Sequence, residues 1–158
     1  MLSFWDILLR LGVATLAGAL IGLNRDLKGK PIGMRTLSLV GLACALVVAV
    51  AEQSLGQDRI GDPTSRVIQG ILTGIGFLGA GVIVHTGSRN HVHGLTTAAC
   101  VWLSACIGIA CGSGHWVLVS VAFAIAFVVL IGGHAVESRL HRLLGGKQDE
   151  KATIAPED

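Results

Sequence analysis

Long uncharged stretches, separated by short clusters of charged residues, set the pattern of this sequence. No Asp, Glu, Lys, Arg or His lies between Thr36 and Ala51, between Val67 and Val84, or between Trp116 and Gly133. A helix of about 20 apolar residues crosses the hydrocarbon core of a bilayer. The pattern therefore predicts five membrane-spanning helices, at about Phe4 to Leu23, Met34 to Ala51, Val67 to Val84, Leu95 to Gly112 and Trp116 to Ala135.

The first and fourth predicted spans are less uniform than the other three. Asp6 and Arg10 lie one helical turn apart near the start of the first span, and we expect them to neutralise each other near the interface. A cleaved signal peptide is the weaker interpretation of this segment, because its basic residue lies inside the apolar run. The fourth span is rich in Thr, Ser, Cys and Gly, which lowers its hydrophobicity without adding charge.

The composition agrees with a membrane protein. The chain has 158 residues, of which 52% are hydrophobic and 14% charged, and its mean hydropathy is +0.70. A soluble domain has about 25% charged residues. We predict an all-α fold, a polytopic membrane helix bundle with about five transmembrane helices, over residues 1–136. Residues 137–158 are predicted to be a short cytoplasmic tail, first amphipathic, either on the membrane surface or extending the fifth helix, and then disordered.

Basic residues are distributed unevenly between the two predicted sides of the membrane. Arg25, Lys28, Lys30 and Arg35 lie in the first connection, and further basic residues follow in the third connection and the tail. Cytoplasmic loops carry the excess of Lys and Arg. The N-terminus is therefore predicted outside and the C-terminus in the cytoplasm.

The third span contains a glycine motif that needs an interpretation. The stretch TGIGFLGAG carries G-x-G-x-x-G, but the strand, amphipathic helix and later acid of a dinucleotide site are missing. We favour close helix packing at small residues over a broken helix that lines an ion or water path. The glycines concerned are Gly70, Gly74, Gly76, Gly79 and Gly81. The same four-residue spacing predicts a tight bundle at Gly18 with Gly22 and at Gly108 with Gly112.

Polar residues near the ends of the spans are the candidate functional residues. Gln69 and Thr73 share a helical face and are candidates to point into a bundle interior. The alternative is that such residues set topology, cap helices or snorkel, and Asp62 before Pro63 fits a helix N-cap. The full set is Arg25, Asp26, Arg35, Thr36, Asp62, Arg66, Gln69, Thr73, Thr96 and Thr97.

The sequence predicts neither an enzyme nor a resident metal. The second to fifth spans contain no acid, whereas Mg²⁺ is usually bound through carboxylates, although hydrated passage past carbonyls and hydroxyls stays open. His91 and His93, with His85 nearby, lack a third fixed ligand. No nucleophile has a paired base, and we expect no cofactor and no nucleic-acid partner. The four cysteines lie in spans and are interpreted as packing residues, at Cys44, Cys100, Cys106 and Cys111.

Several motifs together resemble the membrane domain of the MgtC/SapB family. They are GALIGLNRD with GMRT, DPTSRVIQGILTGIGFLGAGVIV, GLTTAACVW and GIACGSG, from about Leu16 to Gly114. The resemblance implies a multi-pass protein of the bacterial inner membrane, with about five spans. It also implies a link to magnesium homeostasis, to growth in low magnesium and, in pathogens, to survival inside host cells.

The sequence departs from the family pattern at two points. Asn24 stands where the family usually has the acid of G-x-E-R, so a role that needs a carboxylate there requires Asp26 to substitute for it. Larger members continue into a soluble cytoplasmic domain, and we expect regulation through such a domain to be unavailable to this chain.

Two functional hypotheses follow from these observations. The first is a non-enzymatic regulator that binds another integral membrane protein, self-associates through its glycine-rich faces and modulates magnesium homeostasis. The second is a transporter or channel for Mg²⁺ or another cation. The second hypothesis predicts a polar cavity near Gln69, Thr73, Thr96 and Thr97.

Overall fold

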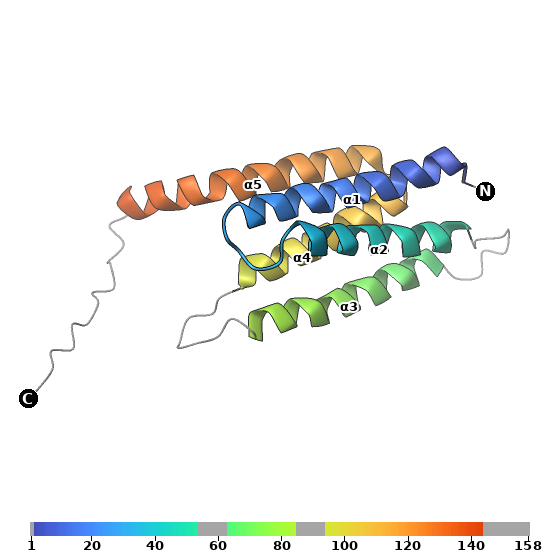
Figure 1. The fold of residues 1–158 in the computed structure, drawn as a ribbon, viewed down its shortest axis with the longest axis horizontal. Coiled ribbons are helices and arrows are strands. Elements are labelled where there is room, and N and C mark those ends of the chain that lie inside the picture. The colour runs from blue at the N-terminus through green and yellow to red at the C-terminus, as the bar shows by residue number, and fades with distance from the viewer. Residues whose placement is uncertain (1, 54–62, 85–93, 144–158) are drawn as a thin grey trace, which may run out of the picture. The chain divides into compact units, whose positions relative to one another are not determined.

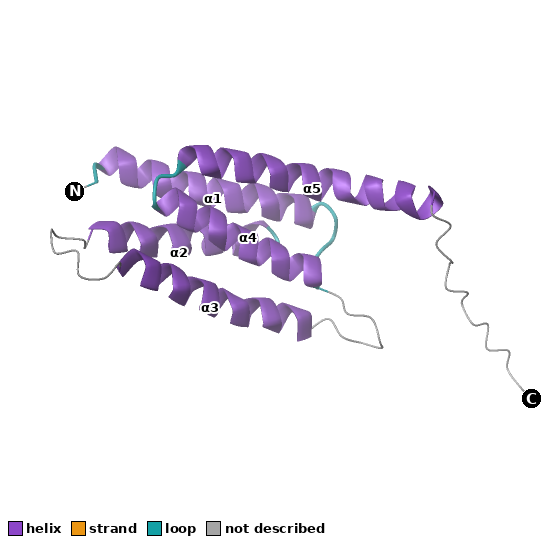
Figure 2. Cartoon of the chain, turned by 180° about the vertical axis from the view of Figure 1, so that it is seen from behind, coloured by secondary structure: helices purple, strands orange, loops and turns teal. Residues whose placement is uncertain are grey.

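The computed structural model describes residues 2–53, 63–84 and 94–143. Within these ranges the chain is helical and contains no strand (Figure 1 and Figure 2). The predicted all-α fold is confirmed. Its five helices are α1 (Phe4–Asp26), α2 (Met34–Gln53), α3 (Pro63–Val84), α4 (Leu95–Gly112) and α5 (Trp116–Leu143).

The helices agree with the predicted spans except near their ends. Four of them are long and apolar enough to cross a membrane, and α5 contains a shorter apolar stretch, Trp116–Gly132. α1 continues past its predicted end, so Arg25 and Asp26 belong to its last turns rather than to the connection. α5 continues to Leu143, which extends the fifth helix into the predicted tail. The predicted disordered end of the tail lies outside the described residues.

The chain forms two compact units, Met1–Ile125 and Ala126–Asp158. The first contains α1 to α4 and the beginning of α5. The second contains the remainder of α5. The candidate site described below lies within the first unit.

The core of the first unit is formed by α1, α2 and α4, which all contact one another. A methyl group added at Gly108 would lie 2.5 Å from a backbone oxygen of α2, and one at Gly112 would lie 2.7 Å from another. A methyl group added at Gly18 or Gly22 of α1 would likewise collide with the backbone of α2. Glycine is required at such contacts because any side chain would collide with the neighbouring helix. The tight packing predicted from the four-residue spacing is present here.

The packing of α3 is much looser. Only 11% of its most apolar stretch is buried in the protein, against 50% for α4. Gly79 faces Ala98 of α4, where an added methyl group would lie 3.7 Å from the alanine methyl. At Gly70, Gly74 and Gly76 an added methyl group would meet no atom within 4 Å. α3 is also continuous, so its glycines neither break the helix nor, apart from Gly79, pack against described neighbours.

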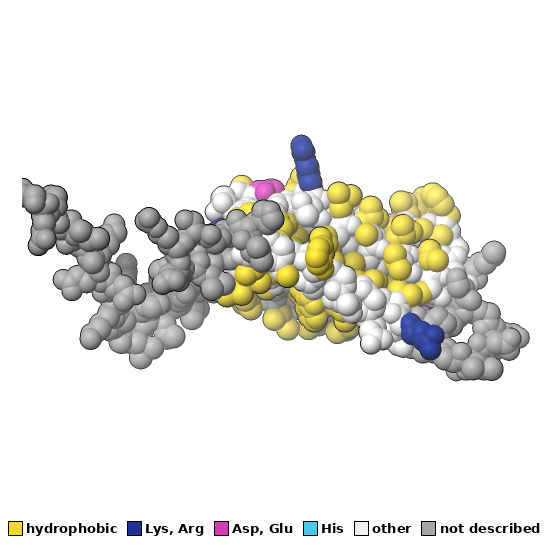
Figure 3. Space-filling model, turned by 90° about the horizontal axis from the view of Figure 1, so that it is seen from below, with side chains coloured by type: hydrophobic (Ala, Val, Ile, Leu, Met, Phe, Trp, Pro, Cys, Tyr) yellow, Lys and Arg dark blue, Asp and Glu magenta, His cyan; other side chains and the backbone are white. Residues whose placement is uncertain are grey.

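Large hydrophobic side chains are exposed along the helices. Examples on three different helices are Phe4, Phe77 and Val117, with exposed fractions of 72%, 81% and 80%. On the face shown in Figure 3, hydrophobic side chains are spread widely and charged side chains form only small patches. An apolar surface of this extent suits contact with lipid rather than with water.

Candidate functional site

A buried arginine stands at the end of α1. Arg25 is only 4% exposed and follows Gly18, Ile21 and Gly22 on the interior face of the helix. Its guanidinium donates hydrogen bonds to the Thr97 hydroxyl, to the Cys100 sulfur at 3.6 Å and to the Pro31 carbonyl at 3.3 Å. The arginine thereby connects α1, α4 and the α1–α2 connection.

The charge of Arg25 is incompletely satisfied. Its Nε atom is buried without a hydrogen-bond partner, and the described part of the chain gives it no ion pair. Burying a guanidinium costs several kcal/mol unless paired charges and hydrogen bonds offset the loss of hydration. The sequence analysis counts Arg25 among the basic residues of the first connection, but the structure shows a buried polar centre at the end of α1.

Asp26 shapes the turn that follows. Its carboxylate accepts a hydrogen bond of 2.8 Å from the backbone N–H of Met34, the first residue of α2. The preceding Gly33 lies directly against this carboxylate, so that a methyl group there would collide with it. Asp26 therefore acts as a cap for α2, and this bond fixes the connection between the first two helices.

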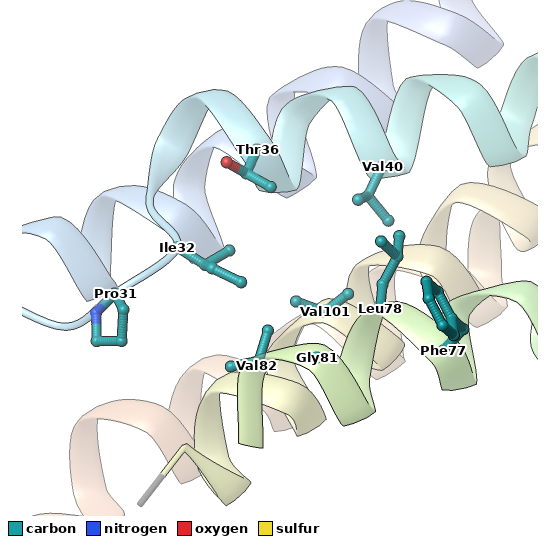
Figure 4. Close-up of a pocket in the computed structure, with 9 residues that line it drawn as sticks. All are labelled: Pro31, Ile32, Thr36, Val40, Phe77, Leu78, Gly81, Val82 and Val101. Atoms are coloured by element: carbon teal, nitrogen blue, oxygen red, sulfur yellow. The ribbon is translucent and has the colours of Figure 1, made fainter. Parts of the chain in front are cut away.

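Ile32 has an unusual backbone conformation in this connection. Its φ is 61°, although a β-branched residue is rarely found in the left-handed region. Its side chain points toward the space between α2 and α3 (Figure 4). Strain of this kind persists only where surrounding structure holds it, and it occurs preferentially at functional sites.

That space is an apolar groove of about 490 Å³ between α2 and α3. Val101 of α4 lies between the two helices and closes part of the groove (Figure 4). The residues that line it are Pro31, Ile32, Thr36, Val40, Phe77, Leu78, Gly81, Val82 and Val101. All of these side chains except that of Thr36 lack a hydrogen-bonding group.

A smaller polar pocket of about 330 Å³ adjoins the start of α2. It is lined by Asp26, Gly33, Met34, Arg35 and Thr36. Because Thr36 lines both cavities, the polar pocket and the apolar groove meet at this residue. The structure therefore brings four predicted residues, Arg25, Asp26, Arg35 and Thr36, to one end of the bundle, with Thr97 bonded to the first.

The other predicted polar residues do not converge on a cavity. Gln69, Thr73 and Thr96 are exposed, and the Thr73 hydroxyl donates to the backbone carbonyl of Gln69 at 2.8 Å. Arg66 is exposed near the start of α3. Asp62 lies outside the described residues. Neither the apolar groove nor the polar pocket is lined by Gln69, Thr73, Thr96 or Thr97.

A charged pair joins the start of α1 to the end of α2, at the other end of these helices from Arg25. Arg10 forms an ion pair of 2.7 Å with Glu52 and donates to the backbone carbonyl of Gly112. The predicted pairing of Arg10 with Asp6 is wrong, since Asp6 is exposed while Glu52 reaches Arg10 from the neighbouring helix. The pair neutralises charge between helices rather than along one helix.

No metal site forms among the described residues. They contain no group of three His, Cys, Asp or Glu side chains that could hold an ion. His85, His91 and His93 lie outside the described ranges. The cysteines are free thiols, and Cys100 does more than fill space because its sulfur accepts a hydrogen bond from Arg25.

Comparison with known proteins places the chain among relatives of several bacterial species. It is 39% identical to Protein SrpB of Synechococcus elongatus over 92% of this chain and 82% of that protein. It is 40% identical to Protein MgtC of Brucella abortus over 90% of this chain and 56% of the relative. For the "Putative magnesium transporter YhiD" of Escherichia coli the values are 36% identity, 85% of this chain and 64% of the relative.

The chain thus spans most of SrpB but only about half to two thirds of the other two relatives. No solved structure matches it. The model of the MgtC family matches residues 11–139, which include Arg25, the groove and all of the glycine positions discussed above. Since this match covers most of the sequence and relatives of 36–40% identity agree with it, the chain belongs to the MgtC family.

Proposed function

We propose that this protein is a non-enzymatic regulator of magnesium homeostasis in the bacterial inner membrane, and that it acts by binding another integral membrane protein. One observation carries the proposal, namely the open glycine face of α3. An added methyl group at Gly70 or Gly74, which share that face, would meet no neighbour within 4 Å. Contacts between helices in lipid are enriched in small residues, which let the two backbones approach closely.

The position of these glycines along α3 favours an external partner. At 100° per residue, Gly70 and Gly74 differ by about 40° around the helix axis and form one stripe. Gly79, which faces α4, lies on nearly the opposite side of the helix. α3 therefore has one side packed in the bundle and another side available to a helix from a second protein or a second copy of this chain.

The link to magnesium rests on the family and on the printed names of relatives. Two of them are called Protein MgtC and "Putative magnesium transporter YhiD". The second name supports transport of Mg²⁺ or another cation as the alternative function. The apolar lining of the groove weighs against this alternative, since a conduit for Mg²⁺ needs oxygen ligands or a path for its bound waters.

The proposal includes an orientation with the N-terminus outside and the C-terminus in the cytoplasm. Its support is the excess of basic residues in the α1–α2 connection, which holds Lys28 and Lys30 between Arg25 and Arg35. In this orientation, Arg25 and the polar pocket lie at the cytoplasmic side. Labelling of a single cysteine placed in this connection, with a reagent that cannot cross membranes, measures the orientation directly.

The deciding experiment compares growth and ion flux. A strain that lacks the gene is complemented in low magnesium with wild type, with Gly70→Leu/Gly74→Leu and with Ala43→Leu as a control on the exposed face of α2. We expect the double variant to accumulate in the membrane but not to restore growth, while the control restores it. Purified wild type in liposomes is expected to show no Mg²⁺ flux. If Mg²⁺ flux is measured, the regulator proposal is wrong and the transporter alternative is supported.

A further inference from the structure

The groove between α2 and α3 has one polar end. α2 begins there, close to Pro31 and Ile32, and α3 runs toward it in the opposite direction (Figure 1 and Figure 2). Thr36 and Val82 line the part near the polar end, and Val40 and Phe77 line the deeper part. A molecule that fills the groove therefore has its apolar part among the helices and any polar group beside the α1–α2 connection.

The length of the groove corresponds to part of an acyl chain. Thr36 to Val40 on α2, and Phe77 to Val82 on α3, each cover roughly 6–8 Å at 1.5 Å per residue. One leaflet contributes about 15 Å of the hydrocarbon core. The groove thus accommodates the half of one acyl chain that lies nearer to its headgroup.

The charges at the polar end select the headgroup. Lys28, Lys30 and Arg35 are exposed there, while Asp26 is the acid in the same segment. The Asp26 carboxylate already accepts the Met34 N–H. Basic side chains therefore outnumber the acid in this segment. This positive charge attracts a lipid headgroup with net negative charge more strongly than a zwitterionic headgroup.

We propose that this groove is a binding site for an anionic phospholipid, with one acyl chain between α2 and α3 and the headgroup beside Lys30 and Arg35. Ile32 forms one wall of the entrance, and the lipid chain packs against its strained side chain. The site lies on the side of α3 that faces α2. Phe77, Leu78 and Gly81 of the groove lie on the same face of α3 as the glycine stripe at Gly70 and Gly74, but further along the helix axis. The two sites are altered by different variants, so the two proposals can fail separately.

The test is native mass spectrometry of the full-length protein in detergent, with phosphatidylglycerol and phosphatidylcholine of identical acyl chains. We expect wild type to retain phosphatidylglycerol preferentially. Each basic residue near an anionic lipid contributes about 1 kcal/mol, which is about fivefold in affinity. Lys30→Gln/Arg35→Gln should therefore lower phosphatidylglycerol binding by about 25-fold. Arg66→Gln, at the other end of α3, should leave it unchanged.

A second pair of variants tests the groove itself. Val40→Trp fills the groove, whereas Val47→Trp makes the same change at an exposed position of α2 that does not line it. Only the first is expected to lose the lipid. If wild type retains both lipids equally, or if Val40→Trp retains phosphatidylglycerol as wild type does, the proposal is overturned. Dimers that Val40→Trp abolishes and lipid does not displace would assign the groove to a second copy instead.

A reporter variant keeps the proposal testable if Val40→Trp does not fold. Val82→Trp places a fluorophore in the part of the groove near its polar end, with Trp5, Trp102 and Trp116 replaced by Phe. Phosphatidylglycerol brominated in the upper half of its chain should quench this tryptophan more strongly than brominated phosphatidylcholine at the same mole fraction. Equal quenching by the two lipids contradicts selective binding.

Discussion

Replacement of Arg25 by methionine separates the structural role of this buried residue from any other role. Arg25→Met is expected to change the free energy of unfolding by no more than about 1 kcal/mol, although the residue is 4% exposed and makes three hydrogen bonds. Methionine preserves most of the aliphatic volume. It also removes a charge that has no ion pair among the described residues.

The magnitude follows from two opposing contributions. Burial of a guanidinium costs several kcal/mol, and a hydrogen bond from a charged donor returns about 1.5–3 kcal/mol. Of the three acceptors, the Cys100 sulfur is weak, the Pro31 carbonyl is distant at 3.3 Å, and Thr97 is the best. The Nε atom makes no hydrogen bond and so contributes no stabilisation. The gain therefore nearly balances the cost, and methionine removes both.

Thr97→Val gives the contrasting case. It removes the best acceptor while the charge stays buried, and the expected loss is about 2 kcal/mol. The assay is chemical unfolding in detergent micelles followed by circular dichroism, with Arg35→Met as an exposed arginine control that should stay within about 0.5 kcal/mol of wild type. If Arg25→Met loses more stability than Thr97→Val, the guanidinium is a net stabiliser of the fold and the reasoning is refuted.

Four further predictions concern stability in the same assay. Gly112→Ala is expected to cost roughly 1–3 kcal/mol, because its methyl group would lie 2.7 Å from a backbone oxygen of α2. Gly74→Ala should instead gain about 0.5–1 kcal/mol, since alanine stabilises a helix where space is open; a loss at this position would contradict the open face. Glu52→Gln, which weakens a half-buried ion pair, should cost about 1 kcal/mol and make stability less dependent on salt. Gly33→Ala should cost about 1–2 kcal/mol through the displaced cap, and an equal additional cost in the Asp26→Ala background would exclude their coupling.

The sequence allowed the helices to be predicted because their signal is local. Uncharged runs of suitable length mark α2 and α3, and the spacing of Gly108 and Gly112 indicates close packing without knowledge of the partner helix. The site depends on contacts between distant segments. Arg25 meets Thr97 and Cys100 across more than 70 residues, and no pattern along the chain specifies that pairing.

One signal for the burial of Arg25 was nevertheless present in the sequence. Gly18, Ile21, Gly22 and Arg25 follow the spacing i, i+3, i+4 and i+7, so the arginine continues the small-residue face of α1. Treating it as a basic residue of a connection hid that spacing. Arg10 was mispredicted for a related reason, because the helical neighbour Asp6 was considered and Glu52, 42 residues away in sequence, was not.

The energetics of glycine connect the loose packing of α3 with the proposed function. Each glycine in a helix interior costs about 0.5–1 kcal/mol relative to alanine, so Gly70, Gly74 and Gly76 together cost roughly 1.5–3 kcal/mol. At Gly108 and Gly112 the close approach of α2 offsets this cost within the chain. At the three positions of α3 the described residues supply no such contact. A helix from another protein or another copy, packed on the stripe at Gly70 and Gly74, would supply it there, and its binding energy would offset the cost of those two glycines.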